Sequence, residues 1–505
     1  MGIHSQITYI PFMTEEASGF SGAVTRGFQW IGVGMITQAF LRIGVLAALT
    51  RMVGPKEFGL LGIALICTSC AERIGQVGVG PALVQKANVD DDDLRTATVL
   101  SWLSGGFIAV ALWGLAPIVA SIFREPQVTL VLTLLAVGFL VDSLAVVPDA
   151  LLQRSLQFRA LVRAETVSYV IGPGIVGVVG AWLGYGVWAL VASHLTMKVV
   201  RVMLTRAAVN IPSGGRFTRK SGSALFAKGV GFSAGRILNF ISLQGDNFVV
   251  GRVLGTEVLG LYTRAYQLMA IPAMFVGQLF ERVLFPALAQ KQHDLLSMRR
   301  AFQASVEVCA VVALPVSVLL FTLSREVVEI LFGSRWLEIA PVLSILSLAV
   351  FFRTTYKCGD TVVRSKGEMA RYTTRQIWYT LIVLGGSWIG AVTAGTIGVA
   401  WAVVLGITVN YILMIQLAAQ LLELPLSALC RAHLPGVWFA LCALLTAVWI
   451  APMARACDLG PLFVVAIVGM TFIGWVGLSL LVGWERLRST SVLSLILQTR
   501  RVPSV

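Results

Sequence analysis

Charged residues are scarce in this sequence, and their scarcity excludes a soluble protein. Only 13% of the 505 residues are Asp, Glu, Lys or Arg, whereas 57% are hydrophobic and the mean hydropathy is +0.83. A soluble domain carries about 25% charged residues and could not bury so much apolar surface. Apolar runs of about 20 residues recur along the chain, which is the length that a membrane-spanning helix needs. The sequence therefore predicts an integral membrane protein.

Cysteine and histidine are too few or too scattered to build a metal or catalytic centre. Cys67 and Cys70 form a CxxC pair inside an apolar run, and no second pair follows at metal-ligand spacing. Buried cysteine commonly packs as a small hydrophobe, so we interpret this pair as core rather than as a redox or metal site. No metal and no cofactor are expected. The four histidines, none of them clustered in the sequence, are His4, His194, His293 and His433.

The N-terminus lacks the marks of a processed or lipid-modified segment. No basic stretch precedes a short apolar core, so we expect no cleavable signal peptide. Gln6 stands where N-myristoylation requires Ser or Thr. We expect the first spanning helix to act as the targeting signal.

The positive charge of the chain follows membrane topology rather than nucleic-acid binding. The formal net charge is +14, and the basic residues collect between the apolar runs. With both termini inside, about 26 Lys and Arg residues fall in cytoplasmic loops and tails, among them Lys357 and Arg364, and about 8 fall in outward loops, among them Arg264. Such a bias also favours contact with anionic headgroups. We therefore expect membrane lipids and no nucleic acid as partners, and a multi-pass membrane protein with both termini cytoplasmic.

The apolar runs predict an all-α polytopic protein with about fourteen transmembrane helices. Two six-helix lobes are expected, with two extra helices after them, and no outward loop is long enough to form a catalytic domain. The predicted units are a cytoplasmic tail at 1–27, the N-lobe at 28–205, a basic cytoplasmic connector at 206–228, the C-lobe at 229–425, two extra helices at 426–485 and a cytoplasmic tail at 486–505.

An internal repeat relates the two predicted lobes. Arg51–Leu60 reads RMVGPKEFGL and is matched by Arg252–Leu261, RVLGTEVLGL, at an offset of 201 residues. Pro81–Lys86, PALVQK, is matched by Pro286–Lys291, PALAQK, at an offset of 205. Both copies of the first motif follow an odd-numbered helix, so the halves share one orientation, as in parallel-repeat transporters with a substrate site between halves. We interpret the motif glycines as residues that permit tight external turns.

Several ionisable side chains lie inside predicted spanning helices, where they usually face a cavity or a partner. Asp246 has no acidic counterpart in the first copy of the repeat, where Val45 stands. Pairing between helices is the structural alternative for Arg236, Asp246 and Arg353, whereas Arg282 lies near a predicted helix end, from which it could reach the headgroups. The candidate cavity residues are Arg42, Arg236, Arg353, Arg282, Gln244 and Asn247, and the candidate coupling or gating residues are Asp246, Glu72 and Glu307.

Arginine is the informative residue type among these charges. A guanidinium stays charged and makes paired hydrogen bonds to carboxylate or phosphate. A cavity with several arginines would suit an anionic cargo, such as a diphosphate-linked sugar that bears uronate. A cavity for organic cations would instead be rich in Asp and Glu.

Four motifs carry a family resemblance: Leu49–Leu60 (LTRMVGPKEFGL), Gln244–Gly255 (QGDNFVVGRVLG), Glu257–Tyr262 (EVLGLY) and Phe285–Leu288 (FPAL). In these motifs the sequence resembles the polysaccharide transporter (Wzx-type flippase) family of the multidrug/oligosaccharidyl-lipid/polysaccharide exporter superfamily, over most of residues 28–425. The resemblance implies two six-helix lobes around a V-shaped central cavity, two peripheral helices and alternating access. Asp246 stands where similar members carry an Asp in the seventh helix, whereas the arginines match no family motif.

The resemblance also implies a cargo. The implied cargo is an undecaprenyl-diphosphate-linked oligosaccharide repeat unit. It would be moved from the cytoplasmic to the periplasmic leaflet of the bacterial inner membrane for exopolysaccharide or lipopolysaccharide synthesis. A polysaccharide polymerase and export proteins are implied as partners, and coupling to protons or sodium is left open. The alternatives are an ion-coupled drug exporter of the same superfamily and, in a different class, a membrane polysaccharide polymerase or ligase.

Overall fold

The computed structural model describes residues 37–75, 79–86, 89–210, 215–218, 233–279 and 294–488, and every regular element within these ranges is helical. The apolar composition explains this, because backbone N–H and C=O groups in a bilayer must be satisfied within their own segment. The predicted all-α polytopic fold is confirmed.

The first half opens with a helix at 37–52 and contains one break that proline explains. Pro173 lies within a π-helical turn flanked by α-helix, as expected where a missing N–H disturbs the hydrogen-bond ladder. The further elements are α2 (Pro55–Gly75), α3 (Val79–Gln85), α4 (Asp91–Phe123), α5 (Gln127–Ser143), α6 (Val146–Arg154), α7 (Phe158–Tyr169), η1 (Val170–Gly177), α8 (Val178–Trp182) and α9 (Val187–Ala207).

The second half contains a long helical segment that folds back on itself. Residues Ala394 and Gly395 of α18 have non-helical dihedrals, and Gly395 has φ 59°. The backbones of Gly390 and Gly398 touch, so the two legs of α18 lie side by side. The elements are α11 (Ser233–Val253), α12 (Thr256–Leu279), α14 (Leu295–Thr322), α15 (Ser324–Phe332), η3 (Ser334–Ile339), α16 (Ala340–Ser347), α17 (Val350–Ser365), α18 (Met369–Leu421), α19 (Leu426–Ala456) and α20 (Pro461–Arg488).

Seven helices in the described ranges are long and apolar enough to cross a membrane, or up to nine if each of two bent pairs forms one span. The bent pairs are α5 with α6, at 44°, and η3–α16 with α17, at 43°. The predicted total of fourteen transmembrane helices therefore stays a prediction, as do the predicted domain limits.

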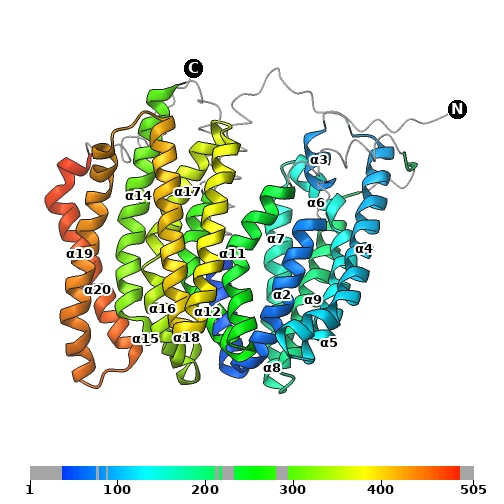
Figure 1. The fold of residues 1–505 in the computed structure, drawn as a ribbon, viewed down its shortest axis with the longest axis horizontal. Helices are drawn as coiled ribbons and strands as arrows, with labels where there is room; N and C mark the ends of the chain where they lie inside the picture. The colour runs from blue at the N-terminus through cyan, green and yellow to red at the C-terminus, as the bar shows by residue number, and fades with distance from the viewer. Residues whose placement is uncertain are drawn as a thin grey trace.

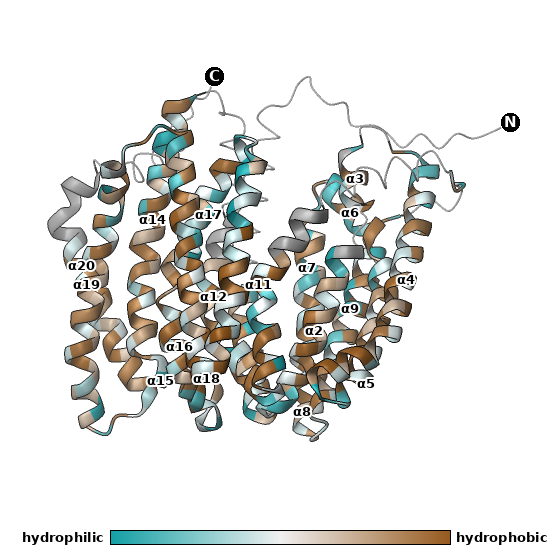
Figure 2. Cartoon of the chain, in the orientation of Figure 1, coloured by the Kyte–Doolittle hydropathy of each residue, from teal (hydrophilic) through white to brown (hydrophobic). Residues whose placement is uncertain are grey.

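The helices form two groups that converge at one end. In Figure 1 the first-half helices, blue to green, lie on one side, the second-half helices lie on the other, and α19 and α20 form the outer edge. The groups approach each other where α2 and α12 begin and spread toward the opposite end (Figure 1). Large apolar side chains such as Phe107 and Trp449 are exposed, and brown predominates along α4, α14 and α19 in Figure 2. These surfaces suit contact with lipid tails.

A short piece of the connector is bound to the first half. The backbone N–H of Arg216 donates to Asp92 at 2.7 Å, and that of Thr218 donates to the Thr96 hydroxyl at 3.0 Å. Gly215 fits closely here, because a Cβ on it would lie 2.0 Å from the backbone oxygen of Asp91. The start of α4 therefore holds residues 215–218 in place.

Candidate functional site

The two halves meet most closely where α2 and α12 begin. A Cβ on Gly59 would lie 1.8 Å from the backbone oxygen of Thr256, and a Cβ on Gly260 would lie 1.8 Å from that of Pro55. Both pairs are matched positions of the repeat, so the contact is nearly symmetric. We call this region the closed end. The interpretation that the motif glycines only permit turns is wrong for Gly59 and Gly260, and only Gly255, with φ 98°, has a left-handed backbone among them.

Two hydrogen bonds between the halves strengthen the closed end. The indole N–H of Trp336 donates to the backbone oxygen of Thr50 at 2.8 Å, in a buried contact. The guanidinium of Arg51 donates to the backbone oxygen of Ile330 at 2.5 Å. Trp336 also packs edge-on against Phe58, with the ring centroids 5.7 Å apart. These contacts join the first helix and α2 to α15 and η3.

Asp246 lies between α11 and α12, with its carboxylate satisfied inside the second half. Its side chain is buried, with only 1% exposed. The Tyr262 hydroxyl donates to Oδ2 at 2.9 Å, and the backbone N–H of Asn247 donates to Oδ1 at 2.9 Å. The side chain of Asn247 donates to Gln244 at 2.6 Å. The predicted coupling residue and two predicted cavity residues thus form one local cluster.

Arg353 lies beside this cluster on α17. Its guanidinium carbon is 4.8 Å from the ring centroid of Tyr266, a cation–π arrangement with α12. Arg353 also interacts electrostatically with Tyr379, Tyr356 and Asp246. The structure therefore brings two sequence-predicted residues of opposite charge, Asp246 and Arg353, into the same interior, surrounded by tyrosines that the sequence analysis did not single out.

A buried hydrogen-bond chain extends this interior to α18. The Gln376 amide donates to the Ser242 hydroxyl at 3.0 Å, and Ser242 is hydrogen-bonded in turn to Thr380. Buried polar groups rarely lack partners, so such a chain fixes helix positions. It links α11 with the first leg of α18, next to the Asp246 cluster.

Arg42 and Arg264 lie on either side of the boundary between the halves. The guanidinium carbon of Arg42, in the first helix, is 5.6 Å from the ring centroid of Tyr169. Arg264, on α12, lies 4.6 Å from the ring centroid of Phe58 and donates to Gln267 at 2.7 Å. Both arginines interact electrostatically with Tyr169. Two cations from different halves therefore share one aromatic neighbour.

Arg264 is a candidate that the sequence analysis missed. We expected it in an outward loop, whereas it lies in the third turn of α12. Its Nε is buried and has no hydrogen-bond partner in the described part of the chain. The spacing of Tyr262, Arg264 and Tyr266 within one apolar run was the signal that could have revealed it.

Glu72 belongs to a separate ion-pair group in the first half. Lys198 of α9 lies 3.7 Å from Glu72 of α2 and is also paired with Asp142 of α5. Side-chain exposure is 20% for Lys198, 42% for Glu72 and 33% for Asp142, so the group is only partly shielded. Arg201, which also lies on α9, pairs with Asp149 of α6 at 2.6 Å. Glu72 is therefore paired with a cation of another helix.

The other predicted residues are Glu307, Arg236 and Arg282. Glu307 lies half-buried on α14, and no cation lies within 4.0 Å of it among the described residues. The backbone of Arg236 lies on the first turn of α11. The side chain of Arg236 and the whole of Arg282 lie outside the described residues, so their predicted roles stay predictions.

One face of α17 carries a continuous polar stripe. Arg353, Tyr356, Lys357, Asp360 and Arg364 recur at helical spacing, so they share a face. Lys357 donates to the backbone oxygen of Ala273 in α12 at 2.9 Å, and Arg364 pairs with Asp360 at 2.9 Å. We expected Lys357 and Arg364 in a cytoplasmic loop, but both lie within α17. Their spacing gives this helix charges along most of its length.

No group of three or more His, Cys, Asp or Glu side chains that could hold a metal ion occurs in the described ranges. Cys67 and Cys70 are free thiols there. The interior offers ionic and aromatic contacts, as the surroundings of Arg264 and Arg353 show.

The helical halves and their interior charges define a two-lobed membrane transporter. The structure is similar to that of the lipid II flippase MurJ in an inward closed conformation, with TM-score 0.71 and 12% identity over 90% of this chain and 100% of that one. It is also similar to an inward-facing multidrug resistance MATE family transporter of the MOP superfamily, with TM-score 0.61 and 17% identity over 78% and 96% of the two chains. At these identities the similarity establishes the fold.

Sequence similarity identifies the family within this class. Residues 48–341 match the family model described as polysaccharide biosynthesis protein, and the chain belongs to that family. It is 25% identical over 410 residues to the teichuronic acid biosynthesis protein TuaB of Bacillus subtilis (strain 168), covering 80% of this chain and 84% of that protein. It is 24% identical over 402 residues to the lipopolysaccharide biosynthesis protein WzxC of Escherichia coli (strain K12), covering 77% and 79%. The predicted family, a Wzx-type polysaccharide transporter rather than an enzyme, is confirmed.

Proposed function

We propose that this protein moves an undecaprenyl-diphosphate-linked oligosaccharide repeat unit from the cytoplasmic to the periplasmic leaflet of the bacterial inner membrane. The family match and the relatives named for teichuronic acid and lipopolysaccharide biosynthesis support this cargo class. The observation that carries the proposal is the gathering of arginines around α12. Arg264 lies on that helix, Arg353 faces its Tyr266, and Arg42 and Arg264 both interact electrostatically with Tyr169.

A diphosphate is the part of the cargo that these arginines suit best. A guanidinium donates paired hydrogen bonds to phosphate oxygens and remains charged at every physiological pH. Arg264 has a buried Nε without a protein acceptor in the described part of the chain. An anionic ligand at this boundary would satisfy that donor. Lys357, and Arg364 paired with Asp360, continue the charged stripe along α17.

Alternating access requires a closed end that can open. The contact at this end depends on close backbone packing at Gly59 and Gly260 and on single hydrogen bonds from Trp336 and Arg51. The neutral bond from Trp336 contributes about 1 kcal/mol, and the bond from the charged Arg51 guanidinium about 1.5–3 kcal/mol. The lobes could therefore separate here without unfolding either one. We assign the closed end to the periplasmic side, as the positive-inside bias predicts.

The cargo assignment is tested by translocation in proteoliposomes that contain the purified full-length protein. A fluorescent undecaprenyl-diphosphate oligosaccharide is placed in one leaflet, and its arrival in the other is followed by accessibility to a soluble quencher. We expect Arg264→Ala and Arg353→Ala each to lower the rate about tenfold or more, because a hydrogen bond to a charged group contributes about 1.5–3 kcal/mol. Arg264→Lys and Arg353→Lys should recover only part of it.

The matched control is Arg325→Ala, because Arg325 is an exposed arginine at the closed end and touches neither cluster. It should translocate at the normal rate. Normal rates in both test variants would remove the arginine path. Efflux of organic cations from the same liposomes would instead favour the alternative of an ion-coupled drug exporter, which the arginine-rich interior disfavours.

Coupling and partners complete the proposal. Asp246, Glu72 and Glu307 are the proposed coupling or gating residues. Glu72 lies in the first half and shares Lys198 with Asp142, so a change in its charge would alter that pairing. If translocation by Asp246→Asn kept the normal dependence on pH and sodium, Asp246 would have no coupling role. A polysaccharide polymerase and export proteins are the proposed partners.

A further inference from the structure

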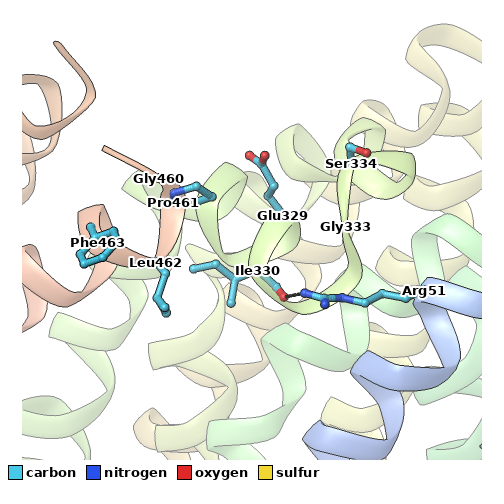
Figure 3. Close-up of a pocket in the computed structure, with 9 residues that line it drawn as sticks. All are labelled: Arg51, Glu329, Ile330, Gly333, Ser334, Gly460, Pro461, Leu462 and Phe463. Carbon is cyan, nitrogen blue, oxygen red and sulfur yellow. Dashed lines mark hydrogen bonds between the residues drawn. The ribbon is translucent and has the colours of Figure 1, made fainter. Parts of the chain in front are cut away.

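A cavity of about 500 Å³ lies at the closed end, away from the arginine clusters described above. Figure 3 shows Arg51 entering it from the first helix and donating to the Ile330 backbone oxygen, with Leu462 and Phe463 on the opposite side. Its other lining residues are Glu329, Gly333, Ser334, Gly460 and Pro461. Three parts of the protein therefore surround one cavity: the first helix, the α15–η3 turn and the start of α20.

The wall that α19 and α20 contribute is held firmly in place. Arg455, near the end of α19, donates to the buried carboxylate of Glu326 in α15 at 2.7 Å, and to the backbone oxygen of Thr322 at 3.3 Å. Ala451 and Val464 also pack with Leu323 in one buried cluster. These contacts hold the start of α20 beside α15, at the edge of the cavity.

The cavity presents both signs of charge without pairing them. Arg51 and Glu329 both line it, yet no ion pair within 4.0 Å joins either to an opposite charge among the described residues. Arg51 donates one hydrogen bond to the Ile330 backbone oxygen, and a guanidinium has several further N–H donors. A ligand that fits this arrangement carries an anion for Arg51 and a cation with N–H groups for Glu329.

The surroundings place this ligand at a membrane surface. Leu462 and Phe463 are 63% and 61% exposed beside the charged residues, and the first part of α20 is largely unburied. The 28 residues of α20 span about 42 Å at 1.5 Å per residue, more than the roughly 30 Å of bilayer hydrocarbon. The first turn of α20 therefore reaches the headgroup region, where acyl chains would continue along its apolar surface.

We propose that this cavity binds the headgroup of a phospholipid that carries a phosphate and a primary amine, as in phosphatidylethanolamine. The phosphate contacts Arg51, the ammonium group donates to Glu329, and the acyl chains lie against Leu462 and Phe463. This site is distinct from the proposed cargo path. Because Arg51 comes from the first half and the other walls from the second half and its extra helices, the bound lipid also favours the closed end.

The test is native mass spectrometry of the purified full-length protein with three lipids of equal chain length. Phosphatidylethanolamine should be retained more strongly than phosphatidylglycerol, which lacks the amine, and phosphatidylcholine, whose quaternary ammonium has no N–H donor. Arg51→Ala and Glu329→Gln should each weaken its retention about tenfold, the loss expected for one charge-assisted hydrogen bond. Arg51→Lys should keep most of the binding.

Matched controls are Arg325→Ala and Glu338→Gln, which alter exposed residues of the same region outside the cavity. Both should retain the lipid normally. Equal retention of all three lipids, or of phosphatidylethanolamine by every variant, would overturn the proposal. Displacement by soluble phosphoethanolamine as effective as by the lipid would also overturn it, in favour of a water-soluble ligand. None of these measurements involves cargo, so the proposed function can fail or stand independently.

Discussion

Gly59 of α2 and Gly260 of α12 occupy matched positions of an internal repeat, and each lets the other half approach its backbone. The oxygen that a Cβ on Gly59 would meet belongs to Thr256, and the one that a Cβ on Gly260 would meet belongs to Pro55, which is the match of Thr256. The repeat has therefore produced a nearly two-fold contact between the lobes. Glycine is therefore needed at both positions, because a side chain at either one would collide with backbone atoms of the other half.

Replacing one of these glycines should weaken the closed end. In Gly59→Ala the new Cβ would force α2 and α12 apart, at a cost of about 1–3 kcal/mol, typical of overpacking. We expect a lower thermal midpoint in detergent and a higher labelling rate for a cysteine placed at buried Val53. Gly62→Ala is the control on the same helix, since its Cβ would meet Leu259 at an ordinary 3.6 Å. Equal behaviour of the two variants would contradict the close packing.

Removing the indole hydrogen bond should loosen the closed end. Trp336→Phe keeps an aromatic ring beside Phe58 but leaves the Thr50 backbone oxygen without this donor. A loss of about 1 kcal/mol would raise the population of the opened form about fivefold. Labelling of the Val53→Cys reporter by a membrane-impermeant maleimide measures this. Trp182→Phe, at a residue that is 75% exposed, should change nothing, and a matching rate in the two variants would argue against the bond's role.

The Tyr262–Asp246 bond should be measurable as a coupling energy. Tyr262→Phe leaves one oxygen of a buried carboxylate without its donor, which costs about 1–3 kcal/mol. Asp246→Asn alone should cost less, and the double variant should be more stable than the sum predicts. Thermal unfolding of the four proteins in detergent gives the result. Strict additivity would mean that the two side chains do not interact, and Tyr185→Phe, at an exposed tyrosine, controls for loss of a hydroxyl.

The first-half ion pairs should show rescue by a second substitution. Lys198→Met leaves Asp142 and Glu72 without the cation between them, so we expect less folded protein in the membrane. Adding Asp142→Asn removes one of the two carboxylates and should restore much of the yield. Size-exclusion profiles of the extracted protein compare the variants. If the double variant were no better than Lys198→Met, the loss would come from packing rather than charge.

Much of the fold followed from composition and pattern. The apolar runs predicted an all-helical membrane protein, and the repeat predicted two related halves, because spanning length and local periodicity are properties of the chain itself. Helix ends were harder. Lys357 and Arg364 were expected in a loop but extend α17, because their polar stripe faces other helices instead of lipid.

The candidate site was predictable only in part. Asp246 and Arg353 were singled out from sequence because charges in apolar runs need partners, and they do share one interior. Arg264 was missed because it lies near the start of a helix. At such a position the sequence does not distinguish an arginine in a loop from one that faces the other lobe. Tyr169 and Phe58, its aromatic neighbours, come from segments about 95 and 206 residues away, and no local pattern connects them.

The sequence by itself determined that this chain is a helical, duplicated membrane protein of the polysaccharide transporter type, since apolar length, charge bias and motifs are read locally. Only the tertiary structure decided which end is closed, which arginines interact with Tyr169 at the boundary and what surrounds the cavity at Arg51. The physical reason is that such contacts depend on how helices far apart in sequence pack. A glycine that looks like a turn residue becomes a point of contact only when a second helix lies against it.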